Sequence, residues 1–280
     1  MNTKIVPLQQ VKELRERTLL GVKDCKRALI TAKGDMETAE NLLKKEGRLK
    51  ANTRIKRKNG EGAAFVYRDR NRYAMLIQTC ETESVAMNEI FRSTGAELAA
   101  TVAHSGSAVI TDEMTDRLKD TMAIFKENMN LRDLVFWNLE DREVVGEYIH
   151  NDGQIAVAVK LACGNKSIGE NPAIMALCSE LAIHICAAAP LFIDRESVDS
   201  DYLKNHEEIF REQSEKVDNI SEETKKKITE GKLNKHISAV CLIEQNFVKD
   251  NSLSIRELIG ETEQETGYNL SVKDFIRLEV

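Results

Sequence analysis

The chain has 280 residues, with 40 Lys and Arg against 46 Asp and Glu, which gives a formal net charge of −6. Residues 1–60 carry 16 basic and 7 acidic side chains, a net charge of +9, whereas residues 61–280 carry 24 and 39, a net charge of −15. An apolar fraction of 42% with only 3 prolines excludes a disordered chain and favours helices over a turn-rich all-β fold. No apolar run approaches the roughly 18 residues that span a bilayer, and no secretion-signal pattern follows Met1, so we expect a cytoplasmic protein without a membrane span.

The N-terminal residues 8–46 have the apolar spacing of three short helices. Gly34 is suited to end the second helix in a left-handed conformation, and Asp35 to cap the third. We expect Gly47 to end the third helix, which makes residues 1–47 a small binding module. The Arg- and Lys-rich residues 48–60 follow as a predicted flexible linker.

From residue 61 the spacing of apolar residues changes from that of helices to that of strands. Apolar runs at 63–67 and 73–79 flank a polar turn and predict a hairpin. Helices are expected over 85–103, with Phe91 on its inner side, and over 112–125. These elements make residues 61–142 the first half of a core.

Residues 143–280 repeat this plan. Strands over 144–149 and 155–162 around a turn at 151–153 are followed by a helix that ends before Pro190. The recurrence of a hairpin and then a helix, about 80 residues apart, indicates an internal duplication. The fold class is therefore α+β: a three-helix module, then a duplicated core of small antiparallel sheets packed by helices.

Two further features lie in the second half. Residues 201–236 are highly charged with sparse apolar positions, which predicts a helical hairpin inserted into the core and mostly solvated. Ser254 and Glu257 have the spacing of a capping box at a helix start, and residues 271–280 read as a final edge strand.

No residue pattern indicates an active site, a metal site or a cofactor. Residues 164–167 lack the glycine spacing of a phosphate loop, and His184 with Cys186 would point to different sides of a helix. The six cysteines form no Cys-x-x-Cys pair and sit among apolar residues, so we expect free buried thiols. The chain is therefore not predicted to be an enzyme.

The basic N-terminal region raises an alternative, an RNA-binding protein. Residues 1–60 contain no aromatic side chain for stacking on bases. About half of their Lys and Arg fall at positions 44–58, which a solvated linker explains as well. A specific nucleic-acid partner is not expected.

Several ordered segments resemble the bacterial elongation factor Ts family. The longest run is Val11-Lys12-Glu13-Leu14-Arg15-Glu16-Arg17-Thr18 followed by Asp24-Cys25-Lys26-Arg27-Ala28-Leu29. The resemblance continues at Cys80-Glu81-Thr82, Glu127-Asn128, Ala182-Ile183-His184-Ile185 and Phe247-Val248, and it covers essentially the whole chain in order.

The resemblance implies a ubiquitin-associated-like N-terminal module, a duplicated core and a helical-hairpin insertion. It implies guanine-nucleotide exchange on elongation factor Tu, without a catalytic residue or cofactor. In the family the N-terminal module docks on the GTPase domain, a Thr-Asp-Phe-Val segment wedges beside the magnesium and phosphate site, and a helix around the His supports that wedge. The partner-binding residues implied here are Val11, Leu14, Arg15, Thr18, Gly21, Asp24, Cys25, Lys26, Thr82, Glu83, Ser84, Val85, Asn88, His184 and Ile185.

The sequence departs from the family pattern at the wedge. Where the family has Thr-Asp-Phe-Val-Ala-Arg-Asn, this chain has Thr82-Glu83-Ser84-Val85-Ala86-Met87-Asn88, so the wedge Phe is replaced by Ser84. Three accounts are open: Glu83 and the surrounding helix still displace the ion, Phe91 partly substitutes for the missing ring, or the chain binds the partner but exchanges poorly. The last account makes a scaffold of the translation apparatus the alternative function. Homodimerisation through the charged hairpin is left open, with nothing in the sequence supporting it.

Overall fold

The computed structural model describes the chain except residues 1–5, 53–58, 165–170 and 217–220. It forms two compact units. The first extends to Asn138 and includes residues 151–154 and 278–280, and the second comprises residues 139–150 and 155–277.

Three helices form the N-terminal module: α1 (Leu8–Thr18), α2 (Val22–Thr31) and α3 (Met36–Asn52). Their core contains the buried side chains Val11, Leu14, Cys25, Ala28, Leu29, Ala32, Ala39 and Leu43. Gly34 has a φ of +91°, and the Asp35 carboxylate accepts the backbone N–H of Thr38 at 2.8 Å. The predicted joint between the second and third helices is therefore confirmed.

The third helix does not end at Gly47, as the sequence suggested, but continues to Asn52. A Cβ atom on Gly47 would lie 2.7 Å from that of Ala123 in helix α6 (Asp112–Phe125). Gly47 thus serves close helix packing rather than helix termination. The predicted linker of residues 48–60 is wrong for its first five residues, and its residues 53–58 lie outside the described part of the chain.

The first sheet has the strand order β1 (Glu61–Arg68), β2 (Arg72–Cys80) and β3 (Asn130–Asn138), all antiparallel. The predicted hairpin is confirmed, whereas β3 was not predicted. Asp133 has a φ of +54°, and the register of β3 against β2 shifts between Met75 and Ile77. This bulge interrupts the alternation by which a strand is recognised.

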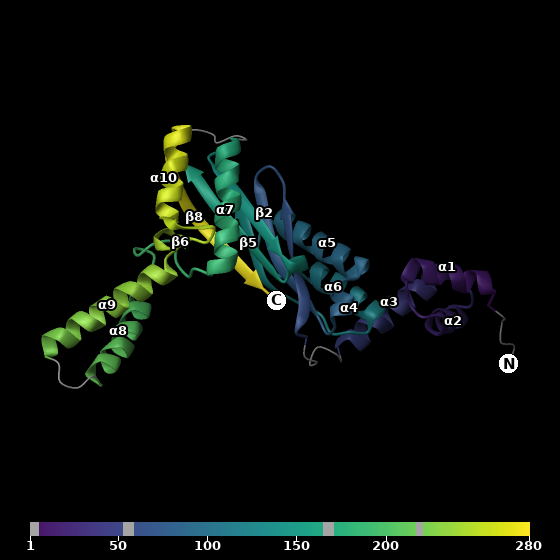
Figure 1. Cartoon of the computed structure of the whole chain (residues 1–280). Coiled ribbons are helices and arrows are strands. Elements are labelled where there is room, and N and C mark those ends of the chain that lie inside the picture. Colours follow the sequence, from purple (N-terminus) through teal and green to yellow (C-terminus); the bar gives the residue numbers. More distant parts are fainter. Residues whose placement is uncertain (1–5, 53–58, 165–170, 217–220) are drawn as a thin grey trace. The chain divides into compact units, whose positions relative to one another are not determined.

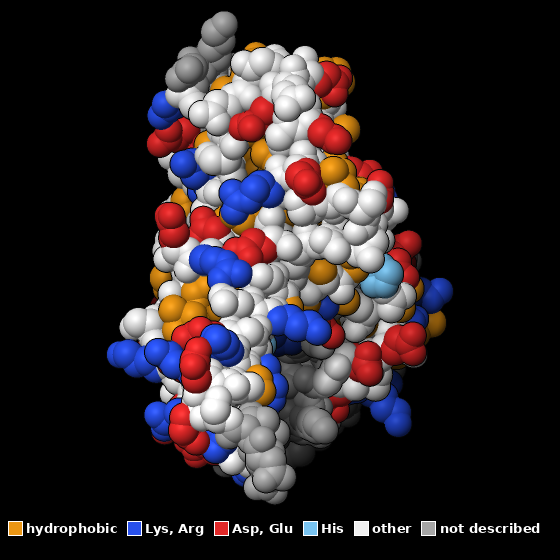
Figure 2. Space-filling view, turned by 60° about the vertical axis from the view of Figure 1, so that its left-hand side comes forward, with side chains coloured by type: hydrophobic (Ala, Val, Ile, Leu, Met, Phe, Trp, Pro, Cys, Tyr) orange, Lys and Arg blue, Asp and Glu red, His pale blue; other side chains and the backbone are white. Residues whose placement is uncertain are grey.

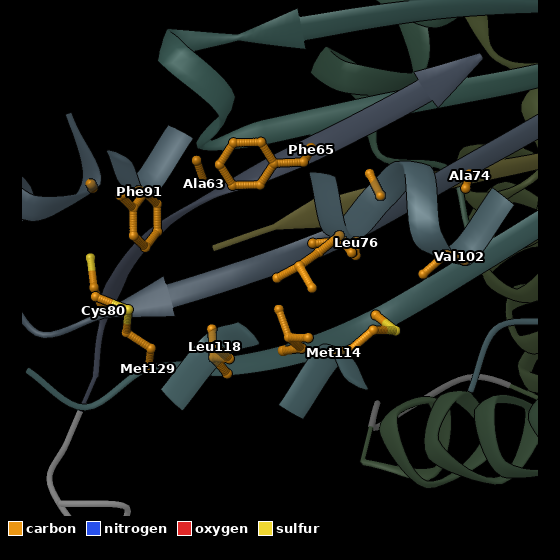
Figure 3. Packing of buried hydrophobic residues seen from close by; sticks show 14 of the residues in the cluster. Ala63, Phe65, Ala74, Leu76, Cys80, Phe91, Val102, Met114, Leu118 and Met129 are labelled. Carbon is orange, nitrogen blue, oxygen red and sulfur yellow. The ribbon is translucent and has the colours of Figure 1, made fainter. Parts of the chain in front are cut away.

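Helices α4 (Glu83–Ala86), α5 (Glu89–Ser105) and α6 accompany this sheet. The single helix predicted over 85–103 is interrupted at Asn88, whose side chain accepts the N–H of Ile90 at 2.9 Å and caps α5. Figure 3 shows the core that these elements share, with Phe65, Leu76 and Phe91 among its buried side chains.

The second sheet has the order β4 (Glu143–His150), β5 (Ile155–Cys163) and β8 (Leu270–Glu279). The predicted hairpin and its turn, the 3-10 helix η1 (Asn151–Gly153), are confirmed. Helix α7 (Pro172–Ala188) packs on β4 and β5, as Figure 1 shows, and helix α10 (Ile255–Thr266) packs on α7.

Both sheets are therefore built from a hairpin, a packed helix and a later third strand. The predicted recurrence of a hairpin and then a helix is present, and the third strand extends it. A glycine allows a close approach of helix and sheet in each half, but from opposite sides. In the first, Gly95 of α5 lies against the ring of Phe65, whereas in the second Gly146 of β4 lies against Cys178 of α7. The final edge strand and the Ser254–Glu257 capping box are also confirmed.

The inserted hairpin consists of α8 (Ser200–Glu215) and α9 (Glu222–Val240), which lie side by side in Figure 1. The hydroxyls of Ser214 and Thr229 hydrogen-bond at 2.8 Å between them, and the ring of His206 stacks on that of His236 at 4.3 Å. The chain then continues through η2 (Leu242–Glu244), β6 (Asn246–Phe247) and β7 (Asp250–Ser254).

Candidate functional site

The segment of residues 82–88, which follows β2, exposes four of the five residues that were predicted within it to bind the partner. Thr82, Glu83, Ser84 and Asn88 are exposed, and so is the Met87 side chain, whereas Val85 and Ala86 are buried and attach the segment to the core. Helix α4 within it has only four residues, which is too short to be stable without tertiary contacts.

One carboxylate holds the start of this segment. Oε2 of Glu127 accepts the backbone N–H groups of Glu81 at 3.0 Å and Thr82 at 3.1 Å, and Oε1 accepts the Thr82 hydroxyl at 2.7 Å. In return, Oε1 of Glu81 accepts the backbone N–H of Asn128 at 2.7 Å. Glu127 follows the left-handed Lys126 that ends α6, so the end of that helix sets the position of the carboxylate.

The thiol of Cys80 lies under the same residues and donates to the carbonyl oxygen of Thr82 at 3.2 Å. Burial, together with the nearby negative charge of Glu127, raises the pKa of Cys80 to about 12. Cys80 is therefore held as an unreactive thiol. The cysteines in the described part of the chain are all buried and free, as predicted.

Arg92 of α5 holds the other end of the segment. Its Nε donates to the carbonyl oxygen of Ala86 at 2.8 Å, and its Nη1 donates to that of Asp152 at 2.6 Å. Its Nη2 lies 3.4 Å from the sulfur of Met87. The sequence reasoning missed both Arg92 and the anchoring role of Glu127, although Glu127 lay in a segment that carried the family resemblance.

Phe91 does not reach the surface beside Ser84. Its side chain is fully buried, and its ring lies 6.0 Å from that of Phe65 in the core shown in Figure 3. The account in which Phe91 substitutes for the missing wedge ring is therefore wrong.

The residues predicted on the N-terminal module divide into three groups by exposure. Val11, Leu14 and Cys25 are buried in its core and support the surface, whereas Thr18 and Asp24 are half-buried. Arg15, Gly21 and Lys26 are exposed, and so are four apolar side chains of the same module: Leu8, Leu19, Val22 and Ile30.

Those exposed apolar side chains were not predicted. On α2, the exposed Val22, Lys26 and Ile30 are spaced i, i+4 and i+8, so they form one stripe of the helix that borders the buried Cys25 and Leu29. This spacing was readable in the sequence. Leu19, at the left-handed end of α1, is exposed as well.

His184 is fully buried on α7. Its Nδ1 accepts the backbone N–H of Val248 at 3.3 Å, which leaves the proton on Nε2 to donate to Oε1 of Gln245 at 2.9 Å. Burial lowers the pKa of His184 despite the Gln245 contact, in keeping with the neutral form that the accepting Nδ1 requires. His184 thus positions residues 245–248, which present the exposed Val248, and Ile185 is buried in the core of the second unit.

The described residues show neither a cluster of three or more potential metal ligands nor a helix long and apolar enough to cross a membrane. Figure 2 shows Lys and Arg side chains interspersed with Asp and Glu over one face, rather than gathered into a patch of one sign. That face therefore does not show the broad basic surface typical of binding through phosphate contacts.

Comparison with known proteins gives the family. The model of the family described as Elongation factor TS matches residues 81–280. A protein named Elongation factor Ts from Treponema denticola is 34% identical over 271 residues, which cover 97% of this chain and 96% of the relative. Its namesake from Borreliella burgdorferi strain ZS7 is 33% identical over 277 residues, 99% of each chain. These alignments extend over the N-terminal module as well as the core, and the chain belongs to the elongation factor Ts family.

Proposed function

We propose that this chain binds elongation factor Tu in its GDP-bound form and promotes release of GDP, so that GTP can rebind. The observation that carries the proposal is the exposed segment of residues 82–88, anchored at both ends, in a chain of this family. The chain acts by binding alone and performs no chemical step.

The proposed mechanism is thermodynamic linkage. If the chain binds the nucleotide-free GTPase more tightly than the GDP-bound GTPase, it must weaken GDP binding by the same factor, and coupling of about 1–3 kcal/mol is typical. The differential contact is assigned to the segment of residues 82–88, with the Glu83 carboxylate directed at the site of the metal ion and phosphates.

Docking is assigned to the N-terminal module. The exposed residues Leu19, Gly21, Val22, Lys26 and Ile30 offer apolar side chains together with a cation, and Lys23 adds a second exposed cation on the same helix. An apolar centre with a charged side chain beside it is the usual composition of a protein interface. His184 contributes by holding residues 245–248 rather than by touching the partner.

The test is release of fluorescently labelled GDP from elongation factor Tu, measured with increasing amounts of the chain. We expect the release rate to rise and then saturate. A rate that stays at its intrinsic value while a complex forms would refute exchange and identify a binding protein without exchange activity.

A further inference from the structure

The exposed segment has few contacts of its own. Of residues 82–88, only Val85 and Ala86 are buried, and α4 spans a single helical turn. A segment of this kind, left unanchored, samples several conformations and loses that freedom when it binds. The conformation of residues 82–88 in the free chain must therefore be fixed by the side chains that contact this segment.

Glu127 supplies three of those contacts from a distant part of the sequence. The Thr82 hydroxyl precedes α4, where it would ordinarily cap the helix, but it makes no capping bond and donates to Glu127 instead. Hydrogen bonds to a carboxylate are about twice as strong as neutral ones. With the reciprocal bond from Asn128 to Glu81, the pair fixes the direction in which the chain leaves β2.

Arg92 acts on the opposite end. Its planar guanidinium joins the carbonyl oxygens of Ala86 and Asp152, so the end of α4 is tied to a second point of the first unit. Between the two anchors, the Glu83 and Ser84 side chains are left exposed.

We propose that Glu127 and Arg92 are positioning residues for nucleotide exchange. Before the complex forms, they already hold the segment of residues 82–88 in the conformation that engages the GTPase. This inference rests on the proposed exchange function. It concerns the preorganisation of the segment and assigns neither residue a contact with nucleotide.

Two variants and one control test the Glu127 anchor. Each is added to elongation factor Tu at a saturating concentration, and the rate of GDP release is measured. Glu127→Ala removes all three bonds, and we expect the maximal release rate to fall about tenfold or more. Glu127→Gln keeps one oxygen for the two backbone N–H groups and an amide for the Thr82 hydroxyl, so it should stay within about threefold of the original chain. Glu212→Ala, which removes an exposed carboxylate from α8, is the matched control.

Alkylation of cysteines, mapped by mass spectrometry on the chain alone, gives a second measurement that does not depend on exchange. Cys80 should react about tenfold faster in Glu127→Ala than in the original chain, while the buried Cys178 of the second unit stays protected. Glu127→Gln separates charge from anchoring. If Glu127→Gln raises the alkylation rate of Cys80 as much as Glu127→Ala does, the negative charge of Glu127 alone controls the reactivity of Cys80, and the anchoring proposal is wrong.

Arg92→Lys keeps the charge but cannot bridge two carbonyl oxygens with a planar fork, so we expect a loss of about threefold or more. Release by Glu127→Ala within twofold of the original chain would overturn the positioning role while leaving the exchange function standing. An original chain without any effect on GDP release would overturn both. If Glu127→Ala also exposes Cys178 and so fails to fold, Thr82→Val decides. A slower release together with faster alkylation of Cys80 in the chain alone supports the anchor, and an unchanged release or unchanged alkylation refutes it.

Discussion

Gly95 of α5 lies directly against the ring of Phe65 of β1, where an added Cβ atom would come within 2.3 Å of the ring carbon Cε2. Alanine normally stabilises a helix relative to glycine by about 1 kcal/mol. Here the added methyl group has no room, since Phe65 also packs against the buried Phe91.

We therefore expect Gly95→Ala to lower the free energy of unfolding by about 1–3 kcal/mol in urea denaturation. Gly231 of α9 is the matched control, because nothing lies within 4 Å of the position of its Cβ. Gly231→Ala should raise the stability by about 0.4–1 kcal/mol. Equal stabilisation by both substitutions would show that α5 is not packed this closely.

Gln78 of β2 is fully buried, and neither its amide nitrogen nor its amide oxygen has a hydrogen-bond partner among the described residues. Burying an unbonded amide costs about 1–3 kcal/mol. Gln78→Leu should therefore leave the free energy of unfolding unchanged or raise it by up to about 2 kcal/mol.

The matched control for Gln78 is Thr94, which is also buried in the first unit but donates to Ile90 and pairs with Thr121 at 3.2 Å. Thr94→Val should cost about 1–2 kcal/mol, because Thr121 loses a partner. If Gln78→Leu is the more damaging of the two, the amide makes a stabilising contact and the prediction is wrong.

The stability of the second unit should fall in mild acid. Burial lowers the pKa of His184 below its usual value near 6.5, so the unfolded chain binds the proton first as the pH falls. His236 adds to this effect, since burial and the adjacent His206 lower its pKa as well. The stability contributed by the neutral histidines is thus fully present above about pH 7 and declines below about pH 6.5. The free energy of unfolding falls by at most about 1.4 kcal/mol per pH unit for each extra proton that the unfolded chain binds.

Urea denaturation from pH 7.5 to pH 5 measures this slope. His184→Gln should be less stable at neutral pH but should lose less on acidification than the original chain. His150→Gln removes an exposed imidazole and is the matched control. An unaltered slope in His184→Gln would mean that His184 does not contribute to the pH dependence.

Ser84 stands where the family resemblance implies a wedge ring. It is exposed, so a larger side chain there meets solvent rather than the core. Ser84→Phe should change the stability by less than about 0.5 kcal/mol. If the missing ring limits exchange, GDP release from elongation factor Tu should become about tenfold faster or more, as expected for a buried aromatic anchor.

The comparable substitution Ser271→Phe places an aromatic ring on an exposed position of β8 and should leave release unchanged. An unchanged or slower rate with Ser84→Phe would show that this chain exchanges nucleotide through other contacts. Glu83 is then the first candidate, because it is the exposed acidic residue next to Ser84.

The local features of the fold were predictable because they depend on neighbouring residues. The hairpin turn at 151–153, the joint at Gly34 and the capping box of Ser254 and Glu257 are each determined within a few positions. Strand β3 was missed because the left-handed Asp133 shifts its side-chain alternation partway along the strand.

What the sequence could not supply are contacts between distant segments. Gly47 looks like a helix end until Ala123 is known to lie against it, and Glu127 has no visible role until its carboxylate meets Glu81 and Thr82. For the candidate site, the exposed segment was predicted from the family resemblance, while the side chains that hold it emerged only from the folded chain.

The separation of β8 from its sheet has a consequence for synthesis. The first sheet is complete once Asn138 has left the ribosome, whereas the second must wait for residues 270–279, about a hundred residues after β5 ends at Cys163. Synthesis at about 5–20 residues per second leaves the β4–β5 hairpin without its third strand for several seconds. During that interval an edge of β5 is unpaired and open to pairing with other chains, so the second half of this duplicated fold depends more on protection during translation than the first.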